Sequence, residues 1–214
     1  MNAIDSVILE VADPRAAARF YSDAFGLDPS RVRVRASDAP STGFRGFTLS
    51  LVVSQPGNVD ALMRAALDAG ATAPKPASKS LWGYGGVVSA PDGTVWQIAT
   101  SAKKDTGPVT RDVDDLVLLL GVEDVKAVKR FYVERGLTVA KSFGGKYVEF
   151  AAGTGAVKLS LYKRRGLAKV AGVSPEGTGS HRLVLSGADE PFSDPDGFVW
   201  EPAAQASAQA PAAG

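Results

Sequence analysis

The chain contains two copies of one sequence pattern, and this repeat constrains the fold more than any other feature. LEVADPRAAARFYSDAFGL (residues 9–27) aligns with LGVEDVKAVKRFYVERGL (120–137), and each copy ends in Pro-Asp-Gly-x-Val-Trp, at 91–96 and 195–200. Self-similarity over a long period indicates one structural unit built twice. We therefore predict four segments: a first domain, a linker, a second domain and a disordered tail, at 1–101, 102–112, 113–203 and 204–214.

Each copy is predicted to begin with a strand that leads directly into a helix. Asp13 and Asp124 are favourable N-cap residues, and apolar residues then recur at helical spacing over 14–25 and 125–135. Further helices are predicted at 58–69 and near 167–173. The predicted strands are 6–11, 32–37, 47–53, 85–90, 94–100, 115–122, 138–143, 146–151, 157–162, 181–186 and 198–202. This order does not alternate strictly between strand and helix, so it favours an α+β fold.

The arrangement of motifs resembles the vicinal oxygen chelate superfamily, which contains glyoxalases, bleomycin-resistance proteins and extradiol dioxygenases. The resemblance rests on a strand before Val-x-Asp, a helix with Phe-Tyr, a Gly-Leu stop and a final Asp-Pro-Asp-Gly-x-x-Trp-Glu strand. It implies a tandem repeat of βαβββ-type modules with curved, mostly antiparallel sheets and helices on the outer face. It also implies a monomer that pairs its own halves, or a homodimer.

Both copies are shorter than a full pair of modules. The first is short between 32–37 and 47–53, where a complete module has more strands. The second passes directly from 184–190 to 191–197 and lacks a counterpart of the helix at 58–69. These departures bear on how complete each cavity is.

The composition excludes several classes of function. The 214 residues include no cysteine, which excludes disulfides, thiolate metal sites and cysteine nucleophiles. The single histidine argues against a catalytic triad and against a metal site with two histidine ligands from one chain. A net charge of +1 gives no reason to expect nucleic acid or an anionic membrane as a partner. No apolar run approaches the roughly 20 residues of a membrane span, and the N-terminus does not resemble a signal peptide. We therefore expect a cytoplasmic protein whose partner is a small molecule.

In metal-using members of the superfamily, ligands sit at three places. These are the start of the first strand, the start of the strand that opens the second module, and the terminal strand after Pro-Asp-Gly. In the first copy these positions fall at Ser6, Phe47 and Gln97. This set contains no carboxylate and no imidazole, so it predicts that the first copy binds no divalent cation.

The second copy is more ambiguous. Its first-strand position falls at Val117, or at Asp115 if the register shifts by two, and the other two positions fall at His181 and Glu201. His181 is either a rim histidine or a ligand. Glu201 is a solvated edge carboxylate, a partner of Arg182, or a ligand. We favour no metal cofactor; the alternative is Zn, Ni, Fe or Mn held by His181, Glu201 and Asp115.

Aromatic residues supply the candidates for ligand binding. SLWGYGG (80–86) combines glycines, which let a backbone approach a ligand closely, with aromatic faces that can stack on a flat molecule. Trp96 and Trp200 are expected to pack in the core. Arg31, Arg33 and Arg35 alternate along one strand, and form either an anion-binding stripe or a solvated face. The ligand-binding candidates are Trp82, Tyr84, Gln97, Phe44 and Phe47.

Three functions are consistent with these observations. The leading hypothesis is metal-independent binding or sequestration of a small molecule in a cleft lined by a sheet. The second is a metal-dependent lyase, isomerase or dioxygenase centred on His181 and Glu201. The third is a catalytically inactive scaffold. No catalytic residue is assigned, and the sequence leaves open whether any reaction is catalysed.

Overall fold

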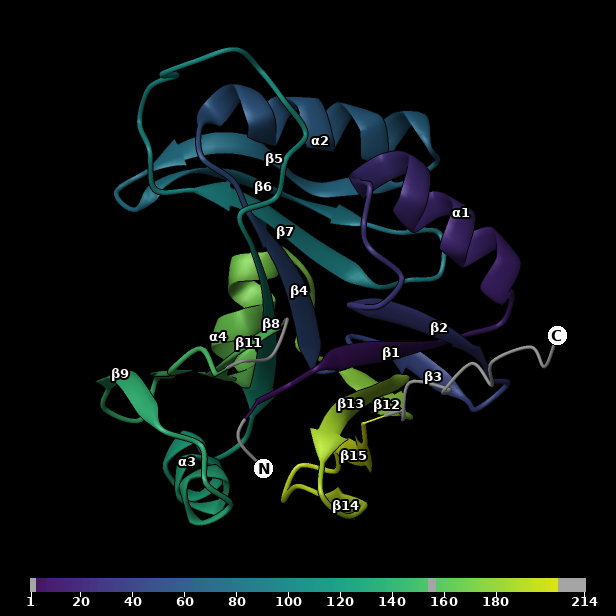
Figure 1. The fold of residues 1–214 in the computed structure, drawn as a ribbon, viewed down its shortest axis with the longest axis vertical. Helices are drawn as coiled ribbons and strands as arrows, with labels where there is room; N and C mark the ends of the chain where they lie inside the picture. Colours follow the sequence, from purple (N-terminus) through teal and green to yellow (C-terminus); the bar gives the residue numbers. More distant parts are fainter. Residues whose placement is uncertain (1–2, 154–156, 204–214) are drawn as a thin grey trace, which may run out of the picture.

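A computed structural model describes residues 3–153 and 157–203, and the predicted strand–helix units form where the sequence places them (Figure 1). The helices are α1 (Pro14–Phe25), α2 (Pro56–Asp68), α3 (Val125–Glu134) and α4 (Arg164–Ala171). The strands are β1 (Ser6–Val11), β2 (Val32–Ala36), β3 (Ser41–Gly43), β4 (Phe47–Val52), β5 (Thr72–Ser80), β6 (Gly83–Ser89), β7 (Val95–Thr100), β8 (Asp115–Val122), β9 (Val139–Phe143), β10 (Tyr147–Phe150), β11 (Lys158–Lys163), β12 (Gly177–Gly179), β13 (Leu183–Ala188), β14 (Phe192–Ser193) and β15 (Val199–Pro202).

The two equivalent helices start in the same way. Asp13 Oδ1 accepts hydrogen bonds from the backbone N–H groups of residues 15 and 16, at 3.0 Å each. Asp124 Oδ1 does the same for residues 126 and 127, at 2.9 and 3.1 Å. The predicted N-caps are therefore confirmed. α1 ends at Gly26, whose φ of 60° is the left-handed conformation that favours glycine after a helix.

Each of the two large sheets takes strands from both sequence copies. The eight-stranded sheet has the order β5-β6-β7-β4-β8-β11-β10-β9, and β4 of the first copy lies antiparallel to β8 of the second. The five-stranded sheet has the order β14-β15-β13-β1-β2, and β1 lies antiparallel to β13. β12 and β3 form a separate pair. The two copies are therefore interleaved in space (Figure 1).

The expected shortening of each copy is visible in the five-stranded sheet. After α1 the first copy returns directly to β2, which pairs parallel to β1. The second copy passes from β13 to β14 with no helix between them. The sheet therefore has only two strands from the first copy and three from the second.

One continuous hydrophobic core joins the two sheets. Trp96 on β7 and Trp200 on β15 are both 0% exposed, as the sequence predicts. Tyr21 of α1 packs against Trp96 with ring centroids 5.3 Å apart, and Tyr132 of α3 packs against Trp200 at 5.7 Å. α1 follows a strand of the five-stranded sheet but contacts a tryptophan of the eight-stranded sheet, and α3 does the reverse. The helices thus connect the sheets.

α1, α2 and α3 pack on the side of the main core, and α4 lies on the other face of the eight-stranded sheet. Leu118 and Leu120 on β8 point into the main core, so Leu119 between them points to the opposite face. Leu167 and Ala168 of α4 are fully buried in a second cluster with Leu119. The helix predicted near 167–173 is therefore present. It covers part of this opposite face, hereafter the inner face of the eight-stranded sheet.

The sequence analysis did not predict four of the described strands, β3, β5, β12 and β14, of which β5 is the longest. β5 reads TAPKPASKS, and proline is unfavourable inside a strand because it has no N–H group to donate. The sheet order places β5 at an edge, where a residue without an N–H group is tolerated. β5 and β6 form a hairpin whose turn carries two highly exposed side chains, Leu81 at 89% and Trp82 at 87%.

The predicted linker is held against the start of α2. Gln55 is 3% exposed, and its side chain bonds the backbone of residues 106–108. Asp105 accepts a hydrogen bond of 2.7 Å from the N–H of Gly57 in the first turn of α2. The predicted tail at 204–214 lies outside the described residues. Within the described ranges, no helix is long and apolar enough to cross a membrane.

Candidate functional site

A cavity of about 810 Å³ lies on the inner face of the eight-stranded sheet. Its size lies within the range of about 300–1,000 Å³ that is usual for small-molecule sites. The residues that line it come from β5, β6, β7, β9, β10, β11 and α4, with the β5–β6 turn. They are Lys75, Ser78, Ser80, Trp82, Gly83, Tyr84, Gly85, Gly86, Val87, Gln97, Ala99, Thr100, Phe143, Tyr147, Tyr162 and Val170.

Two hairpins contribute exposed aromatic rings to this cavity. Trp82 stands in the turn between β5 and β6, and Phe143 ends β9 at the turn into β10, where it is 65% exposed. Phe143 stacks on Tyr147 with ring centroids 5.9 Å apart, and Tyr147 meets Tyr162 edge to face at 4.8 Å. The cavity therefore offers aromatic surface from two separate parts of the chain.

The polar groups of Gln97, Tyr147 and Tyr162 in this cavity are neutral. Gln97 Nε2 donates a hydrogen bond of 2.8 Å to Oγ1 of the buried Thr48. The Tyr147 hydroxyl donates to Glu149 at 3.1 Å, and burial, followed by the nearby charge of Glu149, raises the pKa of Tyr147 to about 12. Burial also raises the pKa of Tyr162. Both phenols are therefore protonated at neutral pH.

Three of the five predicted ligand-binding residues, Trp82, Tyr84 and Gln97, line this cavity together. The Tyr84 hydroxyl is directed away from the cavity, because it donates a 2.8 Å hydrogen bond to Asp60 on α2, on the other side of the sheet. Phe47 is 2% exposed in the main core. Phe44 is 5% exposed and packs in the α4 cluster.

Phe143, Tyr147 and Tyr162 are the aromatic residues of the cavity that sequence analysis missed, and Lys75 is the charged one. Each of the aromatic residues lies on a strand that the sequence does predict, and register places Tyr147 opposite both Phe143 and Tyr162. Alternation along a strand shows which residues of that strand share a face with the aromatic residue. It does not show which strands are neighbours, and so the cluster could not be assembled from the sequence.

The glycines of 83–86 have a different role from the one predicted. A Cβ atom on Gly83 would lie 2.0 Å from the backbone oxygen of Thr100, and one on Gly85 would lie 2.8 Å from that of Ile98. Both contacts are with the neighbouring strand β7. The glycines are therefore required for close approach of two strands, whereas the sequence suggested close approach to a ligand.

His181 is held by two carbonyl groups. Its Nδ1 lies 2.6 Å from the backbone oxygen of Arg45, and its Nε2 lies 3.0 Å from that of Asp196. Its ring stacks on Phe198 with centroids 4.0 Å apart. Each ring nitrogen faces a backbone oxygen of the protein, so neither nitrogen is directed toward a metal site.

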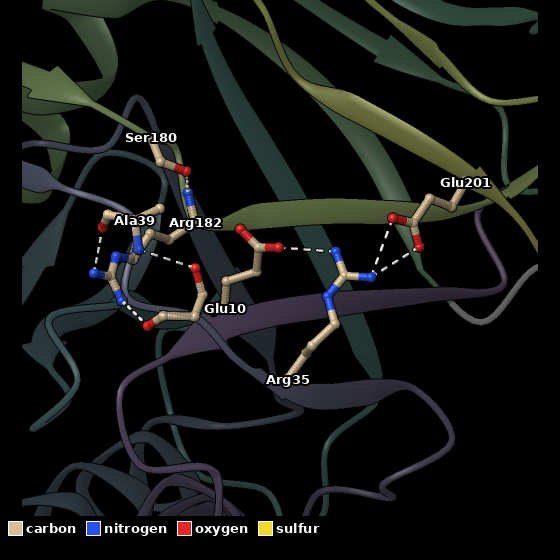
Figure 2. A network of polar contacts seen from close by, with 7 residues as sticks. Glu10, Arg35, Ala39, Ser180, Arg182 and Glu201 are labelled. Carbon is tan, nitrogen blue, oxygen red and sulfur yellow. Dashed lines mark hydrogen bonds and ion pairs between the residues drawn. The ribbon is translucent and has the colours of Figure 1, made fainter.

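Glu201 on β15 forms an ion pair with Arg35 on β2, an edge strand of the same five-stranded sheet. Arg35 Nη1 donates to both carboxylate oxygens of Glu201 at 3.1 Å, and its Nη2 donates to Glu10 at 2.8 Å. Figure 2 shows the guanidinium group lying between the two carboxylates. The suggested pairing of Glu201 with Arg182 is wrong. Arg182 donates instead to the carbonyl oxygen of Ser37 and to that of Ala39, the second of which is labelled in Figure 2.

The proposed metal ligands do not converge. Asp115 lies in the eight-stranded sheet and accepts a 2.7 Å hydrogen bond from Lys158, whereas Glu201 lies in the five-stranded sheet. No group of three His, Asp or Glu residues within 3–153 and 157–203 is arranged to hold a metal ion. At the terminal strand, a guanidinium already supplies the positive charge that Glu201 needs. These residues therefore do not fit a divalent cation.

Comparisons with known proteins establish the fold. No protein-family model and no curated protein matches the sequence. Glyoxalase I from Zea mays superposes with a TM-score of 0.61, covering 92% of this chain and 90% of its own, at 14% identity. A putative dioxygenase from Bacillus subtilis gives 0.60, covering 94% of this chain and 84% of its own, at 13% identity. The predicted vicinal oxygen chelate resemblance is thus confirmed for the fold.

Proposed function

We propose that this protein binds a small molecule with a flat apolar body, without a metal, in the cavity on the inner face of the eight-stranded sheet. The observation that carries the proposal is the cluster of Trp82, Phe143, Tyr147 and Tyr162 around one cavity. Fold alone does not decide activity, since one fold hosts many functions. The proposal therefore rests on the chemistry of the lining residues.

The lining suits an apolar ligand that makes a few hydrogen bonds. Aromatic rings stack on flat molecules, and such pairs contribute about 0.5–1.5 kcal/mol beyond burial of area. The Tyr162 hydroxyl has no hydrogen-bond partner among the described residues, and Gln97 uses only its Nε2. These free polar atoms can fix the orientation of a bound molecule, which is how small-molecule sites generally gain specificity.

Tryptophan fluorescence tests the proposal. The chain has three tryptophans, and two of them, Trp96 and Trp200, are fully buried. Titration with small aromatic and dicarbonyl compounds should therefore change mainly the emission of Trp82. Trp82→Phe should remove this change, and Phe143→Ala should weaken binding by about two- to twelvefold, the equivalent of one aromatic pair.

Leu81→Ala is the matched control, because Leu81 is as exposed as its neighbour Trp82 but does not line the cavity. It should leave affinity unchanged. Binding that is equally tight in Trp82→Ala, Phe143→Ala and the parent protein would place the ligand elsewhere and contradict the proposal.

Metal removal separates this function from the alternative enzyme. Chelator treatment should change neither the melting temperature nor the ligand affinity, because no binding free energy is linked to a metal. Loss of stability on chelation that zinc, nickel or iron restores, and that is absent in Glu201→Ala, would favour a metalloenzyme instead.

A further inference from the structure

We propose that the ligand is an aromatic anion, a flat ring system with one carboxylate-like group, and that Lys75 binds this group. This inference rests on the proposed function and names the chemical class of the ligand. It starts from the charge of the cavity. Lys75 is the one charged side chain among its lining residues within the described part of the chain.

Strand register places Lys75 on the cavity face. Lys75 pairs with Val87 across the β5–β6 hairpin, and Val87 pairs with Gln97 across β6–β7. Paired residues in neighbouring strands point to the same face of a sheet, and all three line the cavity. The aliphatic part of Lys75 also packs beside α4, since a Cβ on Gly172 would lie 3.4 Å from Lys75 Cβ.

The ammonium group of Lys75 is available for a ligand. Its single hydrogen bond within the described residues runs to the backbone oxygen of Val170, over 3.4 Å, and it forms no ion pair there. An ammonium group has three protons to donate, so at least two have no protein acceptor. Val170 lines the same cavity, and its carbonyl therefore holds Lys75 at the cavity edge.

The acids that are hydrogen-bonded to tyrosines of the cavity lining do not cancel this charge. Glu149, which accepts a hydrogen bond from the Tyr147 hydroxyl, is paired with Lys141 at 3.6 Å. Asp60 is bound to the Tyr84 hydroxyl on the α2 side of the sheet. Neither acid lines the cavity. The cavity therefore combines aromatic surface with one net positive charge, which complements an aromatic anion.

Two probes of the same shape test the class of ligand. We compare 2-naphthoate, an anion, with 2-naphthamide, its neutral counterpart, by calorimetry at low and high salt. Naphthoate should bind about two- to fivefold more tightly, as one exposed ion pair provides, and the preference should shrink as salt screens it. Lys75→Gln should reduce the ratio of the two affinities to about one.

Lys79→Gln is the matched control. Lys79 lies on the same strand and carries the same charge, but it pairs with Tyr84 and does not line the cavity. It should keep the full preference for the anion. Circular dichroism verifies that both variants are folded.

The possible outcomes distinguish the two proposals. Equal affinity for both probes in the parent protein would overturn the aromatic anion and leave the proposed function standing. A preference that survives in Lys75→Gln would overturn the role of Lys75. If neither probe binds at millimolar concentration, the binding function itself is contradicted.

Discussion

Strands β7 and β15 carry the same sequence up to the tryptophan and then serve different purposes. Trp96 and Trp200 are equally buried. Each packs against the tyrosine of a helix that follows, in the chain, a strand of the other sheet. The next residue is Gln97 in one strand and Glu201 in the other. Gln97 lines an aromatic cavity and bonds Thr48, whereas Glu201 is clamped by Arg35.

The difference shows that the repeat determines the core and leaves the inner faces free to diverge. Residues that alternate along a strand point to opposite faces, so a tryptophan can be retained for packing while its neighbour changes. On the eight-stranded sheet this freedom places an uncharged residue, Gln97, in an aromatic cavity. On the five-stranded sheet it yields an internal ion pair, in which Arg35 reaches Glu201 across 166 residues of sequence.

The largest expected effect concerns what the two strands share. Trp96→Ala and Trp200→Ala should each lower the free energy of unfolding by about 3–5 kcal/mol, because each removes a fully buried ring. Substitution with phenylalanine distinguishes the two tryptophans, because it removes the indole N–H group. Trp200 Nε1 donates a 3.1 Å hydrogen bond to the Tyr132 hydroxyl, whereas Trp96 Nε1 has no partner among the described residues.

Trp200→Phe should therefore be the more costly of the two phenylalanine variants, by about 1 kcal/mol, the value of one hydrogen bond. Urea denaturation measures both. Equal losses would show that the packing of the two copies, and not the indole hydrogen bond, sets the cost.

An exchange of the residue after each tryptophan tests how the inner faces differ. Glu201→Gln should cost about 0.2–1 kcal/mol, because Arg35 and Glu201 are partly exposed, at 41% and 35%. In an Arg35→Met background the same change should cost nearly nothing further. Gln97→Glu should instead weaken binding of aromatic anions, since it introduces a negative charge into the cavity. A double-mutant cycle and the naphthoate titration provide the measurements; additive losses at Arg35 and Glu201 would show that their contact does not stabilise the protein.

The smallest expected effect is a pH dependence that arises from Asp194 of the second copy. Tyr21 of the first copy donates to Asp92, whereas Tyr132 donates to Asp194, whose place the first copy fills with Ala90. Burial raises the pKa of Asp194. An acid with a higher pKa in the folded protein binds its proton more tightly when folded, so its ionisation lowers stability as pH rises from the unfolded value through the folded value.

The stability of the parent protein relative to Asp194→Asn should therefore be greatest at low pH and should fall as the pH rises above the ordinary aspartate value. Asp124 gives the opposite sign, because hydrogen bonds from Ala127 and Lys126 lower its pKa. Its contribution is present above the unfolded pKa and is lost as the pH falls. Denaturation curves from pH 3 to 7 compare the parent protein with Asp194→Asn and with Asp124→Asn. If the stability difference from the parent changed with pH in the same direction for both variants, this assignment would be contradicted.

The sequence by itself determined the local structure and the contents of the core. Asp13 and Asp124 cap helices because a short carboxylate reaches the first free N–H groups, which depends only on near neighbours. The tryptophans are buried because they alternate with polar residues on apolar strands. The order of strands and helices predicted the α+β class, and the resemblance of the motifs to the vicinal oxygen chelate superfamily predicted the fold, which the comparison with glyoxalase I supports.

Only the tertiary structure decided which strands are neighbours, and the functional surfaces depend on that choice. The pairing of β4 with β8 and of β1 with β13 interleaves the two copies, assembles Trp82 and Phe143 around one cavity, and brings Arg35 to Glu201. It also places Asp115 and Glu201 in different sheets, where each is paired with a basic residue of its own sheet. Backbone hydrogen bonds between strands do not depend on side-chain identity, so a local pattern cannot specify the partner strand. The burial of one common core by both copies specifies it.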